Sequence, residues 1–221
     1  MSTLVLIRHG QSLWNLENRF TGWSDVPLTD QGRKDAATVG AALRDLHFDI
    51  AWTSRLQRAQ ETLKTILKTL KQDLPFECDS ALNERHYGDL QGLNKAETAE
   101  KYGQEQVKLW RRSYGTRPPN GESMEDCERR TTPFFLQYIL PQVVSGKTVI
   151  VAAHGNSLRP MIKLLEKLTP ERAGSMEIGL CTPYIYSFKG DQVVKNEVRE
   201  VPGIITLGAS TTQAKVEGGR V

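Results

Sequence analysis

Apolar and polar positions alternate along the chain in blocks that predict buried strands followed by amphipathic helices. Unbroken apolar runs within 4–7 and 147–153 predict two buried strands. Apolar side chains at helical spacing predict helices from 29 or 30 to about 46 and from 55 to about 72. This alternation predicts an α/β fold: a single, doubly wound domain of three layers, with a mostly parallel sheet and helices on both faces.

Shorter patterns predict the remaining elements. The expected ones are strands over 49–53, 74–78, 182–188 and 192–201, and helices over 95–101, 105–112, 123–143 and 157–168. Residues 13–28 and the glycine-containing segment 80–93 are expected to be loops. We place the domain over residues 1–201. The segment 202–221 is rich in Gly, Ser and Thr, so we expect a flexible C-terminal tail there.

Composition narrows the functional classes. With 38% hydrophobic and 25% charged residues, the chain has the make-up of an ordinary globular protein. A net charge of +3, without a run of Lys or Arg, gives no indication of a nucleic-acid partner. Three widely spaced cysteines (Cys78, Cys127 and Cys181) predict neither a disulfide framework nor a zinc knuckle. We find no signal-peptide pattern and no membrane span, so we expect a cytoplasmic protein without a membrane partner.

Two of the predicted strands end in the same short pattern. The first runs into Arg8-His9-Gly10, and the second runs into His154-Gly155-Asn156. Ligands of open α/β sheets bind just beyond the carboxyl ends of the strands. The free N–H groups at the start of a following helix attract anions, and together with Arg8 they point to phosphate. Each histidine alone could equally be a strand-end residue that hydrogen-bonds the core.

Five motifs that follow one another from about residue 3 to about residue 200 carry a family resemblance. Arg8-His9-Gly10 with the distant His154-Gly155 resembles the histidine phosphatase superfamily. Within it, the segments 15–23, 82–88, 90–95 and 110–112 resemble cofactor-dependent phosphoglycerate mutases. The resemblance implies interconversion of 2-phosphoglycerate and 3-phosphoglycerate through a phosphohistidine at His9. It also implies priming by 2,3-bisphosphoglycerate, no metal, and a minor bisphosphoglycerate synthase or phosphatase activity.

The resemblance assigns catalytic roles to five residues. Neutral imidazole is a competent nucleophile, so His9 would attack phosphorus. Arg8, Arg58 and His154 would surround the transferred group, and His154, if protonated opposite it, would stabilise the charge that develops on it. Glu84 would act as general acid and base, because a phosphate bound beside a carboxyl group favours its protonated form.

A further set is carried over from the family as substrate-binding. Its members are Ser12, Asn15, Thr21, Gly22, Arg85, His86, Tyr87, Lys95, Arg111, Arg112, Gly155 and Asn156. Arg111 and Arg112 are adjacent, so on a helix their side chains diverge by about 100° and one of them faces elsewhere. His86 could instead support its loop. His47 is expected to lie at the end of a surface helix as a charge partner.

Three other functions are compatible with the same residues, and the sequence departs from the family pattern at two places. The chain could be a phosphatase that transfers the phosphoryl group to water, an inactive phospholigand-binding scaffold, or a zinc protein using His9, Glu84 and His154.

Gln11 stands where many relatives have Glu. The loop after Arg112 is shorter than in many relatives, which leaves the predicted homo-oligomer (dimer or tetramer) open. We also expect the tail and the segment 94–121 to close over the site and exclude water.

Overall fold

The apolar runs form one mixed sheet in a computed structural model that describes residues 1–204. The strands are β1 (Ser2–Arg8), β2 (Ile50–Ser54), β3 (Phe76–Asp79), β4 (Thr148–Ala153), β5 (Pro183–Lys189) and β6 (Gln192–Val198). Their order across the sheet is β3-β2-β4-β1-β5-β6. The first four in this order are parallel, whereas β5 runs antiparallel to β1, and β6 antiparallel to β5. The predicted α/β class is confirmed, with an antiparallel hairpin at one edge of the sheet.

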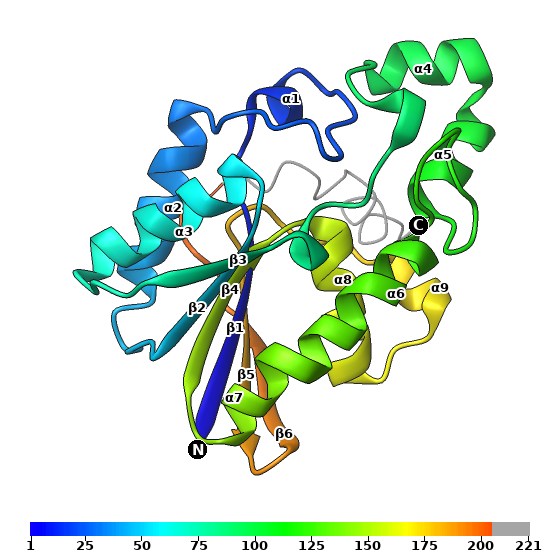
Figure 1. Cartoon of the computed structure of the whole chain (residues 1–221). Helices are drawn as coiled ribbons and strands as arrows, with labels where there is room; N and C mark the ends of the chain where they lie inside the picture. The colour runs from blue at the N-terminus through cyan, green and yellow to red at the C-terminus, as the bar shows by residue number, and fades with distance from the viewer. Residues whose placement is uncertain (205–221) are drawn as a thin grey trace, which may run out of the picture.

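Helices cover both faces of this sheet (Figure 1). They are α1 (Leu13–Leu16), α2 (Asp30–Ala42), α3 (Gln57–Leu70), α4 (Lys95–Tyr102), α5 (Gln104–Arg112), α6 (Met124–Phe134), α7 (Leu140–Val144), α8 (Gly155–Glu166) and α9 (Pro170–Ser175). Short turns η1 (Ser80–Leu82) and η2 (Gly88–Leu90) and the π-helix η3 (Phe135–Ile139) complete the elements. Across residues 1–204, no helix has both the length and the apolar character needed to span a bilayer.

The two-residue period of a strand sends the side chains of β1 into two separate cores. Leu4 and Leu6 join a cluster with residues of α8, α7 and η3. Val5 and Ile7 join a second cluster with residues of α2 and α3. In Figure 1, α2 and α3 accordingly lie on one side of the strands, and α6, α7 and α8 on the other. Because β1 is buried on both faces, it forms a rigid support for the residues that follow it.

Most predicted elements are present, with ends shifted by a few residues. The loop expected over 13–28 contains the short helix α1, and α9 was not predicted. Helix α2 ends at Ala42, well before His47, so the expected position of His47 at a helix end is wrong. Residues 205–221, on which most of the tail prediction falls, lie outside the described part of the chain.

The helix predicted over 123–143 is divided into α6, η3 and α7. Pro133 lies inside α6, where its missing N–H removes one helical hydrogen bond and its ring crowds the preceding turn. The chain widens into the π-helix η3 directly after α6 and then resumes as α7, with Pro141 in the first turn. Proline thus alters the helix without ending it.

The first turn of α2 holds the loop that follows β1. The Thr29 backbone N–H donates to the Gln11 carbonyl at 2.9 Å, and the Thr29 hydroxyl donates to Gln11 Oε1 at 2.8 Å. Gly10 and Gly32 face each other so closely that a Cβ on either one would overlap the backbone of the other segment. Two residues without side chains therefore let α2 pack directly against the segment that carries His9.

We expect Gly32→Ala to destabilise the protein by about 1–3 kcal/mol, because the new methyl group would overlap the Gln11 backbone. Helix propensity alone would give the opposite sign, since alanine is the better helix former by about 1 kcal/mol. Urea unfolding measures the difference. Gly115→Ala is the matched control, because a Cβ there meets nothing within 4 Å. Equal or higher stability of Gly32→Ala would contradict the close approach.

Candidate active site

The pairing of β1 with β4 brings the two histidines together. The strands are parallel, and Arg8, the last residue of β1, lies opposite Ala153, the last residue of β4. The next residue of each strand is a histidine, and the centroids of the rings of His9 and His154 lie 5.0 Å apart. Both side chains are buried. Two short motifs separated by most of the chain therefore form one site.

The hydrogen bonds of His9 fix which ring nitrogen faces a ligand. Nδ1 lies 2.7 Å from the carbonyl oxygen of Gly10, which can only accept, so Nδ1 carries the proton. In the neutral ring, Nε2 then keeps its lone pair, toward which Arg58 Nε donates at 3.3 Å. His154 Nε2 lies 2.7 Å from the hydroxyl of Ser54, and its Nδ1 has no partner among the described residues. His154 Nδ1 is thus left for a ligand, and His9 Nε2 can face one when Arg58 Nε donates to that ligand instead.

Arg8 and Arg58 supply positive charge beside these rings. Arg58 is the second residue of α3, and its guanidinium donates to the carbonyls of Gly22 at 2.8 Å and Ser24 at 3.0 Å. Arg8 donates to the carbonyl of Ile178 at 2.8 Å, and its Nε finds no acceptor within residues 1–204. Burial lowers the pKa of both groups, that of Arg58 to about 10, so both stay charged at neutral pH.

Burial and the neighbouring cations keep both histidines neutral. Loss of hydration lowers the pKa of His9 well below its usual value, and the charges of Arg58 and Arg8 lower it further. Burial is also the largest cause that lowers the pKa of His154, followed by the charges of Arg58, His9, Arg8 and Arg130. His9 therefore has the protonation state that a nucleophile needs. The ring of His154 is neutral in the free protein as well, and its expected protonation opposite a bound phosphoryl group stays a prediction.

Glu84 lies against the first turn of α8. Its Oε1 accepts from the backbone N–H of Arg85 at 2.7 Å and from that of Asn156 at 3.2 Å. The side chain is close enough to Arg8 and Arg58 for its charge to oppose the lowering of their pKa values by burial. The site thus holds one carboxyl group within reach of two guanidinium groups.

A second group of cations lies around Tyr87. The Arg85 guanidinium lies 4.6 Å from the centre of the Tyr87 ring, and the Tyr87 hydroxyl accepts from Asn156 Nδ2 at 3.4 Å. Burial lowers the pKa of Lys95 to about 8 and also lowers that of Arg111. Burial raises the pKa of the Tyr87 hydroxyl, but Arg85 and Lys95 outweigh this effect and leave it lowered. This group offers charge for a second anionic end of a ligand.

The smaller predicted residues shape the loops around the pair. Ser12 caps α1, and its hydroxyl donates to Asn15 Oδ1 at 2.9 Å. Thr21 is buried, and Gly22 has a φ of +55° that an L side chain rarely adopts. Gly155 and Asn156 are the first two residues of α8. Their roles stay predictions.

Three predicted binding residues are also held by the protein itself. Arg85 is fully buried and donates to the Arg111 carbonyl at 3.2 Å, while two of its nitrogens find no partner in the described structure. Arg112 pairs with Glu177. His86 Nδ1 accepts from the Gly88 N–H at 3.0 Å, as the loop-supporting alternative requires.

Comparison with known proteins shows the family of this chain. The sequence profile of the histidine phosphatase superfamily (branch 1) matches residues 4–200. A protein of Gloeobacter violaceus, named 2,3-bisphosphoglycerate-dependent phosphoglycerate mutase 2, is 52% identical over 192 residues, which cover 86% of this chain and 88% of that protein. The protein of Bartonella henselae named 2,3-bisphosphoglycerate-dependent phosphoglycerate mutase is 50% identical over 203 residues, which cover 90% and 98%. This chain belongs to the 2,3-bisphosphoglycerate-dependent phosphoglycerate mutase family.

Solved structures agree on the fold. Bacillus stearothermophilus YhfR matches with a TM-score of 0.78 and 28% identity, over 93% of this chain and 98% of that one. A mycobacterial glucosyl-3-phosphoglycerate phosphatase matches with a TM-score of 0.77 and 24% identity, over 90% and 98%. The second likeness shows a shared fold alone. The predicted family resemblance is confirmed by the sequence matches.

The mutase-family site contains three polar residues that sequence reasoning did not single out. Ser54 is the last residue of β2 and its hydroxyl is hydrogen-bonded to His154. The expectation that site residues lie at the carboxyl ends of strands could therefore have identified it. Arg159 lies one helical turn after Asn156 in α8 and donates to its Oδ1 at 2.7 Å. Arg130 contacts the Glu84 segment from α6, and no local pattern marks it. Among residues 1–204, no group of three or more His, Cys, Asp or Glu side chains is placed to hold a metal ion.

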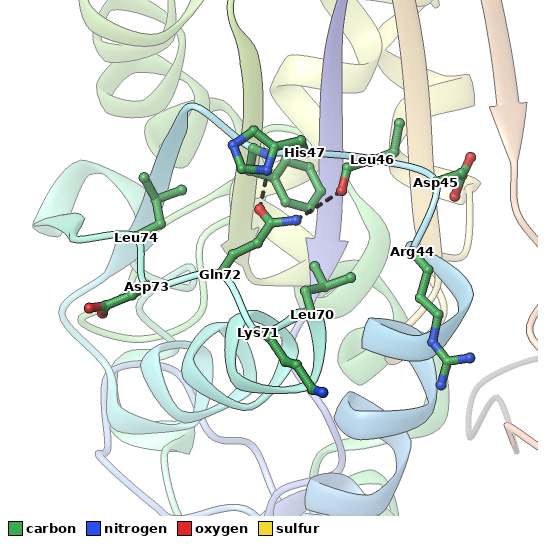
Figure 2. Close-up of a pocket in the computed structure, with 10 residues that line it drawn as sticks. Arg44, Asp45, Leu46, His47, Leu70, Lys71, Gln72, Asp73 and Leu74 are labelled. Atoms are coloured by element: carbon green, nitrogen blue, oxygen red, sulfur yellow. Dashed lines mark hydrogen bonds between the residues drawn. The ribbon is translucent and has the colours of Figure 1, made fainter.

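The pocket drawn in Figure 2 is separate from this site. It has a volume of about 470 Å³ and is lined by residues 44–48, after α2, and 70–74, at the end of α3. These segments lead into β2 and β3, so the pocket lies at the opposite end of the strands from the histidines. His47 is one of its labelled side chains.

We expect the free energy of unfolding to fall as pH drops below about 6.5, because the unfolded chain then binds protons that buried His9 and His154 refuse. Above that pH the contribution is constant. Urea unfolding at a series of pH values from neutral to mildly acidic measures it. A double variant, His9→Asn with His154→Asn, should lose most of this dependence. An unchanged dependence, or imidazole NMR signals of either residue that titrate near the ordinary histidine value, would contradict the neutral pair.

Proposed function

We propose that this chain interconverts 3-phosphoglycerate and 2-phosphoglycerate by way of a phosphoryl group carried on His9. The observation that carries the proposal is the pair of neutral, buried imidazoles between two charged guanidinium groups. The names of relatives at about half identity over most of the chain support the same activity. The second group of cations, around Lys95 and Arg111, suits a substrate with a carboxylate beside its phosphate.

One half of the catalytic cycle transfers a phosphoryl group from a bisphosphoglycerate to the protein and leaves a monophosphoglycerate as the product. His9 Nε2 forms the new bond to phosphorus as the ester P–O bond breaks, and Glu84 gives its proton to the departing oxygen. Arg8 and Arg58 balance the charge on the three equatorial oxygens. His154, which is neutral in the free protein, donates from one ring N–H once an anion is bound. A dianion so close also favours protonation of His154.

The other half transfers the phosphoryl group from His9 to the free hydroxyl of a monophosphoglycerate, so that a phosphoryl group arrives on one oxygen and later leaves from the other. The acceptor hydroxyl attacks phosphorus, the N–P bond breaks, and Glu84 takes the hydroxyl proton. The proton balance closes, because one carboxyl group gives and regains the same proton. Asn156 and Arg85, whose backbone N–H groups bind Glu84 Oε1, keep that carboxyl group between the two positions.

The polar atoms of the site suit 2,3-bisphosphoglycerate. Arg8 Nε, both free nitrogens of Arg85, His154 Nδ1 and Arg159 Nε are buried and find no acceptor among the described residues. Unpaired buried donors are costly, and anionic oxygens would satisfy them. When bound, this compound would supply the phosphoryl group that loads His9. Arg8 and Arg58 would hold one phosphate, and Lys95 with Arg111 the other end.

Water must be kept from the loaded site, since a phosphatase would result otherwise. Helices α4 and α5 extend beyond the sheet (Figure 1). A separate apolar cluster of Phe20, Leu90, Val107 and Trp110 attaches them to the loops around the site. The predicted closure by segment 94–121 and the tail stays a prediction, as do a cytoplasmic location and a homo-oligomer.

We expect isomerisation of 3-phosphoglycerate that depends on added 2,3-bisphosphoglycerate and exceeds hydrolysis in rate. A coupled assay for 2-phosphoglycerate, run beside an assay for inorganic phosphate, measures both. His9→Asn should abolish both activities, because it removes the proposed nucleophile beside Arg58. Hydrolysis without isomerisation would favour the phosphatase, and no turnover with a folded protein would favour the inactive scaffold.

A further inference from the structure

The backbone that carries Glu84 has little secondary structure of its own. Residues 83–87 lie between the short turns η1 and η2 and belong to neither a helix nor a strand. A carboxyl group that must transfer a proton needs its position fixed to a fraction of an ångström. Contacts from elsewhere in the chain must therefore fix this loop.

Arg130, in α6, supplies most of those contacts. Its Nη1 donates to the carbonyls of Ala81 at 2.9 Å and Asn83 at 3.0 Å, and its Nη2 donates to that of Glu84 at 2.9 Å. Its Nε and Nη2 also bind the carboxylate of Glu122, at 2.9 Å and 3.0 Å. A planar guanidinium can serve this many acceptors at once, whereas a lysine ammonium cannot.

Glu122 extends the same contacts to the other side of Glu84. Its Oε2 accepts from the backbone N–H of His86 at 2.8 Å, and its own N–H donates to the His86 carbonyl at 2.8 Å. Arg130 and Glu122 together thus hold the loop at the carbonyls of Asn83 and Glu84 and at the N–H and the carbonyl of His86. Arg130 and Glu122 act as one unit, because each binds the other.

Trp23 adds a second donor to the Glu84 carbonyl. Its indole N–H donates to that oxygen, and its ring lies 5.6 Å from the Arg130 guanidinium. The neighbouring carbonyls of Gly22 and Ser24 accept from Arg58. The carbonyl of Glu84 is therefore tied both to α6 and to the loop that holds Arg58.

Helix α6 also sets the distance from this loop to α8. The thiol of Cys127 donates to the carbonyl of Asn156 at 3.4 Å, and the hydroxyl of Thr131 donates to that of Ala81 at 3.0 Å. Asn156 in turn binds the Glu84 carboxyl group through its backbone N–H. Both ends of Glu84, the backbone and the carboxyl group, are thus positioned relative to one helix.

We propose that Arg130 is a positioning residue for Glu84, and that through the Glu84 backbone it places the proton-transferring carboxyl group against the reacting oxygen. The proposal rests on the proposed role of Glu84 in phosphoglycerate isomerisation. Arg130 donates to the backbone of the loop and to Glu122, so its loss should slow the chemical step and spare substrate binding.

The test is a double-mutant cycle with Glu84→Gln and Arg130→Met, measured by isomerisation of 3-phosphoglycerate. Arg130→Met should lower kcat by about 100-fold, the size expected when a reacting group is displaced by about 1 Å. KM should change far less than kcat, because the cations Arg8, Arg58, Lys95 and Arg111 lie outside this loop and still bind the substrate. In the Glu84→Gln background, Arg130→Met should cause no further loss, since the misplaced group is already absent. Arg130→Lys, which keeps the charge and one or two donors, should recover part of kcat.

Arg129→Met is the matched control. Arg129 is the neighbouring arginine of α6, but its side chain is exposed and pairs with Glu125 and Asp126. Its kcat should equal that of the unmodified protein. Thermal unfolding identifies a variant that does not fold, in which case Arg130→Lys completes the cycle.

The outcomes distinguish a failure of this proposal from a failure of the proposed role of Glu84. Losses that multiply in the double variant, or a KM that rises as much as kcat falls, would show a general structural role and overturn the proposal. An unimpaired Arg130→Met beside an impaired Glu84→Gln would also overturn it, with the role of Glu84 intact. An unimpaired Glu84→Gln would instead refute the proposed role of Glu84.

Discussion

The parallel pairing of β1 with β4 is the constraint on which the site depends. Its register places Arg8 opposite Ala153, so that His9 and His154 leave the sheet at the same point. A slip by one residue would turn one of the two histidines toward the other face. Buried residues on both faces of β1 oppose such a slip, because it would exchange the members of the two apolar cores. The geometry of the histidine pair therefore follows from core packing.

The electrostatics of the site follow from the same burial. Arg8 and Arg58 stay charged, since even a lowered guanidinium pKa remains far above neutrality. The imidazoles have an ordinary pKa near neutrality and so give up their protons instead. The result is an excess of positive charge around two neutral imidazoles. Such a site attracts phosphate and keeps His9 in the protonation state that the proposed attack requires.

Local patterns were sufficient for the parts of the site that lie at element ends. The strand-His-Gly pattern identified both histidines, and the family motifs located Glu84 and the cationic residues near it. The structure brings these residues together, while their individual roles stay predictions. Sequence periodicity could not reveal α9, which has a single turn and a half, or the division of α6 by η3. It also placed the end of α2 too late, because Leu43 and Leu46 continue the apolar stripe after the helix has ended.

Contacts between distant segments were beyond any local pattern. Ser54 meets His154, and Arg130 meets Glu84, across long stretches of chain. Arg130 lies in an ordinary charged stretch of α6, where its neighbour Arg129 is an exposed surface residue. The sequence does not distinguish these two arginines, because only the fold decides which one faces the Glu84 loop.

The most direct test of this account is the position of the phosphate on the protein after brief exposure to 2,3-bisphosphoglycerate. Mass spectrometry of an alkaline-quenched digest gives the residue, and phosphorus NMR distinguishes the two ring isomers. Since Nδ1 of His9 is bonded to the Gly10 carbonyl, the account predicts an acid-labile phosphate on Nε2 of His9. Phosphate on Nδ1 of His9 or on His154, or no phosphohistidine in a protein that isomerises phosphoglycerate, would contradict it.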